Sequence, residues 1–166
     1  MVKFLGMRTN EIKVIVYEYE DLNELPVEYA DLLKRAREAA KNAYAPYSEY
    51  YVGAAVRLVS GEIITGNNQE NAAFPSGLCA ERVALFSANA NFPEKAVSTI
   101  AVTALNKDGH IHDSVSPCGA CRQVLLETES KFHQPVNIVL DGAGSVRVLE
   151  GVENLLPISF RPESLK

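Results

Sequence analysis

The spacing of apolar and polar positions along the chain predicts a series of short strands and longer helices. Residues 11–20 alternate, with Ile12, Val14 and Val16 on one side, which is the period of a β-strand. The other side is only partly polar, so this strand lies either at the edge of the domain's own sheet or beneath another element or subunit. Apolar positions then recur at helical spacing over residues 29–43 and predict an amphipathic helix that ends before Pro46.

The rest of the chain also consists of segments with either strand or helix spacing. Residues 51–60 and 62–65 predict two strands joined in a hairpin, and Gly53 in the first of them predicts close approach by a helix or a ligand. Strands alternating with helices indicate a three-layer α/β domain, in which helices flank a sheet that the hairpin makes mixed. The further elements are helices at residues 79–89 and 118–128 and strands at residues 97–105, 136–141 and 145–149.

Composition narrows the class of protein. The 166 residues suit one domain, and 47% of them are hydrophobic, which is enough for a core. A net charge of −5 predicts neither a nucleic acid nor an anionic membrane as partner. The initial apolar run is too short for a signal peptide, and no stretch reaches the roughly 18 apolar residues of a membrane span. With three cysteines and no export signal, we expect a cytoplasmic protein.

All of the cysteines lie in two segments that open predicted helices. Cys79 is in the first, while Cys118 and Cys121 form a C-x-x-C pair in the second. Three thiolates suit tetrahedral Zn²⁺ and leave one corner open, which is typical of a catalytic rather than a structural zinc. Glu81 stands two residues after the first thiol, so it is the candidate proton carrier for a water in that corner.

Other interpretations of the cysteines remain open at this point. A C-x-x-C pair alone is more often half of a structural zinc site or a redox pair. A closed structural site needs a fourth donor, and His110, His112 and His133 are the candidates. None of these has ligand-type spacing to a cysteine, so each is interpreted as an ordinary exposed histidine.

Polar residues surround the predicted metal segments. The loop at residues 66–72 enters the first of them, and its Asn and Glu side chains are suited to a sugar diol. Three thiolates leave the site negative, and neighbouring donors to sulfur would offset that charge. Arg82 and Gln123 are predicted to be such donors, and Arg122 is a weaker candidate.

The metal segments and several others resemble the zinc-dependent cytidine deaminases, in the small, homotetrameric, all-cysteine type. The resemblance covers about residues 36–166, so residues 25–166 are expected to form the catalytic domain, with residues 1–24 as an N-terminal extension that adds a strand to it. It implies one Zn²⁺ per chain and hydrolytic deamination of cytidine and 2′-deoxycytidine to uridine and 2′-deoxyuridine, with release of ammonia, in pyrimidine salvage. The matching segments are residues 47–55, 66–73, 78–82, 116–125 and 155–160.

The resemblance also implies roles for individual residues. Asn68 and Glu70 would hold the ribose, and Tyr50 would stack on the base where the family usually has Phe. The backbone N–H of Ala80 would bind the pyrimidine carbonyl, and the carbonyl of Ser116 would lie near the leaving amine. Glu81 would transfer protons from the water to the pyrimidine and to the departing ammonia.

Assembly and substrate preference are less determined. The resemblance implies a homotetramer in which Phe160 reaches the site of a neighbouring subunit. Arg161, Gln69 and Phe74 depart from the family's usual residues, although none of them is a metal ligand. The preference between cytidine and deoxycytidine stays open. A deaminase of another aminopyrimidine nucleoside such as a nucleoside antibiotic, a nucleic-acid-editing deaminase and a non-catalytic zinc-binding domain remain the alternatives.

Overall fold

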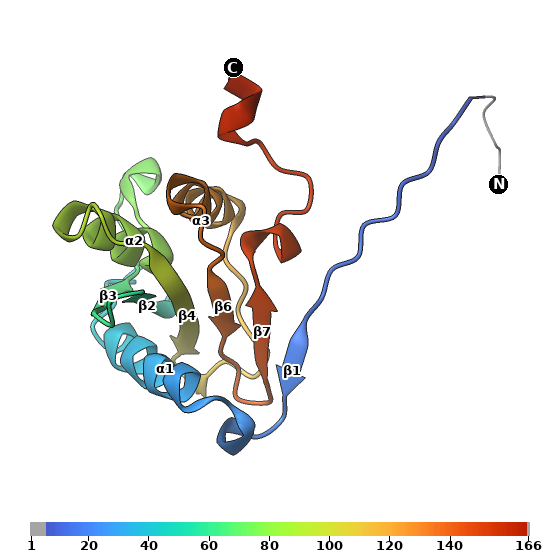
Figure 1. Cartoon of the computed structure of the whole chain (residues 1–166). Coiled ribbons are helices and arrows are strands. Elements are labelled where there is room, and N and C mark those ends of the chain that lie inside the picture. Colours follow the sequence, from blue (N-terminus) through green and yellow to red (C-terminus); the bar gives the residue numbers. More distant parts are fainter. Residues whose placement is uncertain (1–5, 166) are drawn as a thin grey trace.

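The computed structural model describes residues 6–165, which form one seven-stranded sheet between helices (Figure 1). The strand order is β1-β7-β6-β4-β2-β3, and β5 pairs with β4 beside this path. Only the β4–β6 pair is parallel within the described residues, so the predicted mixed sheet is confirmed. The strands are β1 (Tyr17–Tyr19), β2 (Tyr51–Leu58), β3 (Ile63–Asn67), β4 (Val97–Asn106), β5 (Gly109–His110), β6 (Asn137–Leu140) and β7 (Val146–Glu150).

Helices cover both faces of the sheet, as the three-layer prediction requires. The first, α1 (Val27–Ala40), packs on one face, and α2 (Ala80–Asn91) with α3 (Gly119–Phe132) packs on the other (Figure 1). Buried aliphatic side chains on one side of each helix make these contacts: Leu32, Leu33 and Ala36 on α1, Ala84 and Leu85 on α2, and Leu125 and Leu126 on α3.

Two glycines set the distance between the layers. A Cβ on Gly53 of β2 would lie 2.0 Å from the carbonyl oxygen of Ala36, so glycine lets α1 approach the sheet. On the other face, a Cβ on Gly66 of β3 would lie 2.5 Å from the backbone nitrogen of Ala84. The close approach predicted at Gly53 is therefore made by a helix.

The N-terminal strand is much shorter than predicted. Only Tyr17–Tyr19 pairs in the sheet, at its edge, opposite residues 146–148 of β7. The pairing stops at Val148, although β7 continues to Glu150, and the N–H of Ile15 instead donates to the side chain of Asn154 at 2.9 Å. The earlier part of the segment leaves the body as an exposed extended arm (Figure 1). The strand predicted at residues 11–16 is thus wrong, and residues 1–5 of the predicted extension lie outside the described part.

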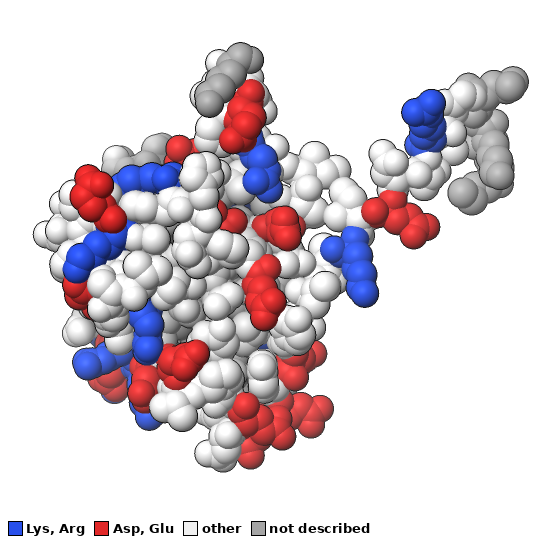
Figure 2. All heavy atoms as spheres, in the orientation of Figure 1, with Lys and Arg blue, Asp and Glu red and all other residues white. Residues whose placement is uncertain are grey.

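Other helix and strand ends differ by a few residues from the predicted ones. The first helix ends at Ala40 rather than near residue 43, and the strand predicted to end at residue 65 continues to Asn67. The two-residue strand β5 was not predicted. Between residues 6 and 165, the helices are all too short or too polar to cross a membrane. Acidic and basic side chains are interspersed over the face drawn in Figure 2.

Candidate active site

The start of α2 and the start of α3 lie close together and bring the cysteines into one cluster. Cys79 is the N-cap of α2, Cys118 is the N-cap of α3, and Cys121 follows one turn later. The first backbone N–H groups of a helix have no partner within the helix, and they carry the positive end of its dipole. Both helix starts therefore favour ionised sulfur where the thiols meet.

The sulfur positions fit a tetrahedral zinc ion. The Sγ atoms of Cys79 and Cys118 are 3.8 Å apart, and those of Cys118 and Cys121 are 3.5 Å apart. Sulfurs at about 2.3 Å from a tetrahedral zinc are separated by roughly 3.8 Å. All three Sγ atoms lie within 4.8 Å of one another, and within residues 6–165 no histidine or carboxylate completes the cluster. The site thus offers three sulfur atoms that would hold one metal ion.

Arg82 supplies positive charge to the thiols. Its Nη2 donates to Cys79 Sγ at 3.7 Å, as predicted for a donor beside the ligands. The contact with Cys121 and this donation lower the pKa of the Cys79 thiol to about 5. The same sulfur contact, together with burial, raises the pKa of the Cys121 thiol. Cys79 therefore ionises more readily than Cys121, and a cation such as zinc favours the ionised form of a thiol that binds it.

Glu81 is a buried carboxyl group in the first turn of α2. It is 4% exposed and lines the same cavity as Cys79 and Cys118. Burial raises the pKa of its carboxyl group, and the charge of Cys79 raises it further. A carboxyl group whose pKa is raised accepts and returns a proton readily, which is the property that a general acid and base requires.

The cavity beside the thiols has a volume of about 610 Å³, and a few polar side chains stand in a lining that is otherwise mostly apolar. Asn68 and Glu70 both line it. The side chain of Asn68 is fixed by β2, because its Oδ1 accepts from Val52 N at 2.7 Å and its Nδ2 donates to Tyr50 O at 2.9 Å. Each end of this amide retains one further hydrogen-bonding position.

Two residues that the sequence did not single out hold Glu70 in place. The backbone N–H groups of Tyr47 and Ser48 donate to Glu70 Oε2, and the Ser48 hydroxyl donates to Oε1. The Ser48 hydroxyl and the Tyr47 N–H hold the pKa of Glu70 below its usual value. Glu70 is therefore an ionised acceptor at the cavity wall. Its position two residues after Asn68 was visible in the sequence, but the turn that binds it was not.

The other predicted substrate contacts divide into two groups. Tyr50 and Ser116 line the cavity, and Ala80 is the fully buried first residue of α2. Phe160 instead lies 59% exposed on the C-terminal segment, outside the lining of this cavity. The cavity lining of a single chain therefore includes the predicted contacts except Phe160 and Ala80, and Ala80 lies in the chain between the lining residues Cys79 and Glu81.

Three sequence interpretations need correction. Gln123 Nε2 donates to the carbonyl of Phe160 at 2.9 Å rather than to a sulfur. Arg122 instead donates to main-chain and hydroxyl oxygens, namely Pro117 O, Leu155 O and Ser116 Oγ. His110 is not an ordinary exposed histidine, because its Nε2 lies 3.0 Å from the buried carboxylate of Asp141.

Three thiols within reach of one metal ion, beside a buried carboxyl group, fit a zinc hydrolase better than a redox or structural site. The family model for the cytidine and deoxycytidylate deaminase zinc-binding region matches residues 27–133, so the chain belongs to that family. It is 46% identical over 96 residues to the cytidine deaminase of Halalkalibacterium halodurans, covering 58% of this chain and 68% of that protein. Identity to the Mycobacterium tuberculosis H37Rv cytidine deaminase is 38% over 101 residues, covering 61% and 71%.

Solved structures agree with this assignment. A crystal structure of cytidine deaminase from Burkholderia pseudomallei has a TM-score of 0.68 and 38% identity, over 78% of this chain and 97% of that chain. The structure of the Mycobacterium tuberculosis enzyme has a TM-score of 0.62 and 31% identity, over 82% and 99%. The fold and the zinc-binding deaminase domain predicted from the sequence are confirmed.

Proposed function

We propose that this protein is a zinc-dependent cytidine deaminase that converts cytidine and 2′-deoxycytidine to uridine and 2′-deoxyuridine with release of ammonia. One observation carries the proposal: the buried Glu81 carboxyl group lines the same cavity as a three-thiol cluster whose spacing fits zinc. The similarity to proteins named cytidine deaminase supports the choice of substrate class.

The residues present fit a zinc ion held by Cys79, Cys118 and Cys121. When bound, zinc supplies a Lewis acid that makes a water molecule more acidic. Glu81 takes the proton from that water and delivers it to N3 of the pyrimidine. Addition of the water oxygen at C4, with the proton on N3, replaces the C4=N3 double bond and leaves a tetrahedral carbon that still carries the amine. Glu81 then carries the second proton from the added hydroxyl to the amine, and the C4–N bond breaks as the C4 carbonyl forms and ammonia leaves.

The cavity wall is proposed to orient the nucleoside. Glu70, ionised and held by Tyr47 and Ser48, accepts from a ribose hydroxyl, and Asn68 uses its remaining donor and acceptor on the same sugar. Tyr50 stacks on the base. The Ala80 N–H binds the pyrimidine carbonyl and the Ser116 carbonyl accepts from the amine. Because orientation lowers the entropic part of the barrier, these contacts contribute to the rate as well as to affinity.

Absorbance provides the direct test. Zinc-loaded protein is incubated with cytidine, deoxycytidine, cytosine and other aminopyrimidine nucleosides, and loss of the aminopyrimidine band is followed with ammonia release. We expect turnover of cytidine and deoxycytidine and none of free cytosine, which lacks the sugar. Turnover confined to another aminopyrimidine compound would replace the proposed substrate, and a zinc-loaded protein inactive on all of them would replace the proposed reaction.

The assembly and its setting are part of the proposal. We propose a cytoplasmic homotetramer in which Phe160 completes a neighbouring subunit's cavity, with residues 25–166 as the catalytic domain. The exposure of Phe160 supports this arrangement. Light scattering gives the oligomeric state, and mixing Phe160→Ala chains with Glu81→Gln chains tests the shared cavity, because each chain supplies what the other lacks only if Phe160 crosses between subunits.

A further inference from the structure

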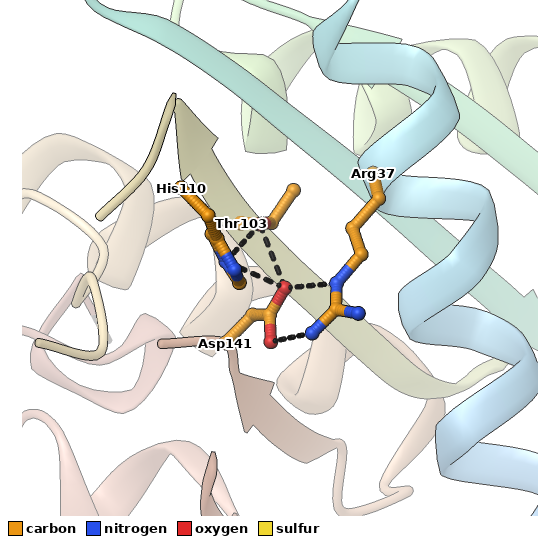
Figure 3. A network of polar contacts seen from close by, with 4 residues as sticks. All are labelled: Arg37, Thr103, His110 and Asp141. Carbon is orange, nitrogen blue, oxygen red and sulfur yellow. Dashed lines mark hydrogen bonds and ion pairs between the residues drawn. The ribbon is translucent and has the colours of Figure 1, made fainter. Parts of the chain in front are cut away.

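Asp141 is a fully buried carboxylate (0% exposed) that directly follows β6 and lies outside the lining of the thiol cavity. Figure 3 shows the three side chains that converge on it. Arg37 of α1 donates through Nε and Nη2 to both carboxylate oxygens, each at 2.7 Å. Thr103 Oγ1 of β4 donates at 2.8 Å, and His110 Nε2 of β5 lies 3.0 Å from the same oxygen. One side chain thus joins α1, β4 and β5.

The main chain after Asp141 holds a wall of the cavity. The wall segment, residues 111–116, contributes Val115 and Ser116 to the cavity lining and leads directly to Pro117 and the ligand Cys118. Three hydrogen bonds attach this segment to the chain after β6: Val115 N to Asp141 O at 3.4 Å, Ala143 N to Ile111 O at 2.9 Å, and Gly144 N to His112 O at 3.0 Å.

Gly142 shows how closely the two chains lie. A Cβ at this position would be 2.7 Å from His112 O and 2.7 Å from Ser114 N. Both are backbone atoms, so any side chain at residue 142 would displace the wall segment. The residue directly before this glycine is the one that the Arg37 guanidinium clamps.

We propose that Asp141 is a positioning residue for the deamination reaction: clamped by Arg37, Thr103 and His110, it fixes the wall segment that presents Val115 and Ser116 to the substrate. This inference rests on the proposed function. A bidentate guanidinium–carboxylate pair has a defined geometry, and the Thr103 hydroxyl removes the remaining freedom of the carboxylate. Because the clamp acts through the backbone of residues 141–144, it determines the wall without touching the nucleoside.

The test separates positioning from plain stability. Asp141→Asn keeps the size of the side chain but loses the ion pair, and Gly142→Ala moves the wall segment while leaving the clamp untouched. We expect both variants to lose about 10- to 100-fold in kcat/KM per bound zinc for cytidine, because misplacement by about 1 Å costs rate to this extent. The assay temperature lies well below the unfolding midpoint of each variant. Hydrogen exchange in the peptide that contains residues 111–116 is expected to become faster.

Milder variants keep the test decisive if Asp141→Asn does not fold. Thr103→Val removes one donor without changing shape, and Arg37→Lys keeps the charge but not the bidentate geometry. Both should show a smaller loss in the same direction. Arg147→Ala is the matched control, since Arg147 forms an exposed ion pair with Glu18 at the sheet edge and has no bond to the wall segment. We expect it to keep the wild-type rate.

The outcomes are distinct. A wild type that does not deaminate cytidine overturns the proposed function. An active wild type whose Asp141→Asn or Thr103→Val variants unfold at lower temperature, yet keep kcat/KM per zinc within twofold, overturns the positioning role and leaves a structural one. Loss of kcat/KM with faster local exchange, absent from Arg147→Ala, supports it.

Discussion

Glu81 and Asp141 are both buried carboxyl groups, yet their surroundings differ in the hydrogen-bond donors that they offer to the carboxyl oxygens. Asp141, on the α1 face, is held by a bidentate guanidinium and a hydroxyl, so both of its oxygens are engaged. Glu81, on the α2 face, borders a cavity, and its neighbour Arg82 directs Nη2 to Cys79 instead. Burial raises the pKa of Glu81, whereas pairing with Asp141 raises the pKa of Arg37.

Burial alone therefore does not decide whether a carboxyl group can exchange a proton with a substrate. A carboxylate whose oxygens are both engaged by charge-assisted hydrogen bonds has no position from which to exchange a proton with a substrate. A carboxyl group without a dedicated cation, next to a cavity, keeps that position and prefers the protonated form more than it would in water. We therefore expect Glu81 to matter for chemistry and Asp141 for geometry and stability, and substitutions can separate these roles.

The largest effect is expected from Glu81→Gln. The amide keeps the shape of the side chain but does not carry a proton between water and the pyrimidine, so kcat should fall by about 10²- to 10⁴-fold. Zinc content, measured by atomic absorption, should stay that of the wild type because the three sulfurs are unchanged. Deamination of cytidine at more than a tenth of the wild-type rate would contradict the role of Glu81.

The next effect concerns stability, and we expect it to be larger when Arg37 is replaced than when Asp141 is replaced. Arg37→Leu leaves the Asp141 carboxylate fully buried with its main partner removed, which should cost about 3–5 kcal/mol in the free energy of unfolding. Asp141→Asn leaves the Arg37 side chain, which is 32% exposed and can turn toward water, so it should cost less. Urea unfolding of the two variants measures this order. Equal costs, or the reverse order, would contradict the assigned surroundings of the pair.

These two regions also show how far the sequence predicts the molecule. Helical and strand periods predicted the layers, and the positions of Cys79 and Cys118 at predicted helix starts predicted the thiol cluster, because local pattern determines which residues open a helix. The Asp141 cluster was not predicted, because Arg37 and Asp141 are 104 residues apart and only the fold brings them together. Likewise, the first strand pairs over only three residues, and the N–H of Ile15 bonds to Asn154, 139 residues away, a contact that the alternation of the strand does not encode.

Arg82→Ala is expected to have an intermediate effect. The donation from Arg82 Nη2 to Cys79 Sγ offsets negative charge on the sulfurs, and losing such a partner of a ligand typically lowers metal affinity by about 10- to 100-fold. Competition with a chelator measures the affinity, and Arg82→Lys should recover part of it. Arg147→Ala serves as the control for loss of a positive charge. An unchanged zinc affinity in Arg82→Ala would show that Arg82 does not support zinc binding by the sulfurs.

The smallest effect is expected at a third carboxylate, the half-buried Glu62 at the surface. Glu62 forms an ion pair with Lys95, and the bonds from Lys95 and Ser60 lower its pKa to about 2. A carboxyl group whose pKa is lower in the folded state stabilises the fold above its unfolded pKa of about 4.5 and loses that contribution as the pH falls toward about 2. Glu62→Gln should therefore have a slightly lower urea midpoint of unfolding than the wild type at pH 6. This difference in midpoint, the gap, should narrow between pH 5 and pH 3. Because exposed ion pairs are screened by salt, added NaCl should narrow it at pH 6 as well. A gap that widens on acidification would show that the pair does not set the protonation of Glu62.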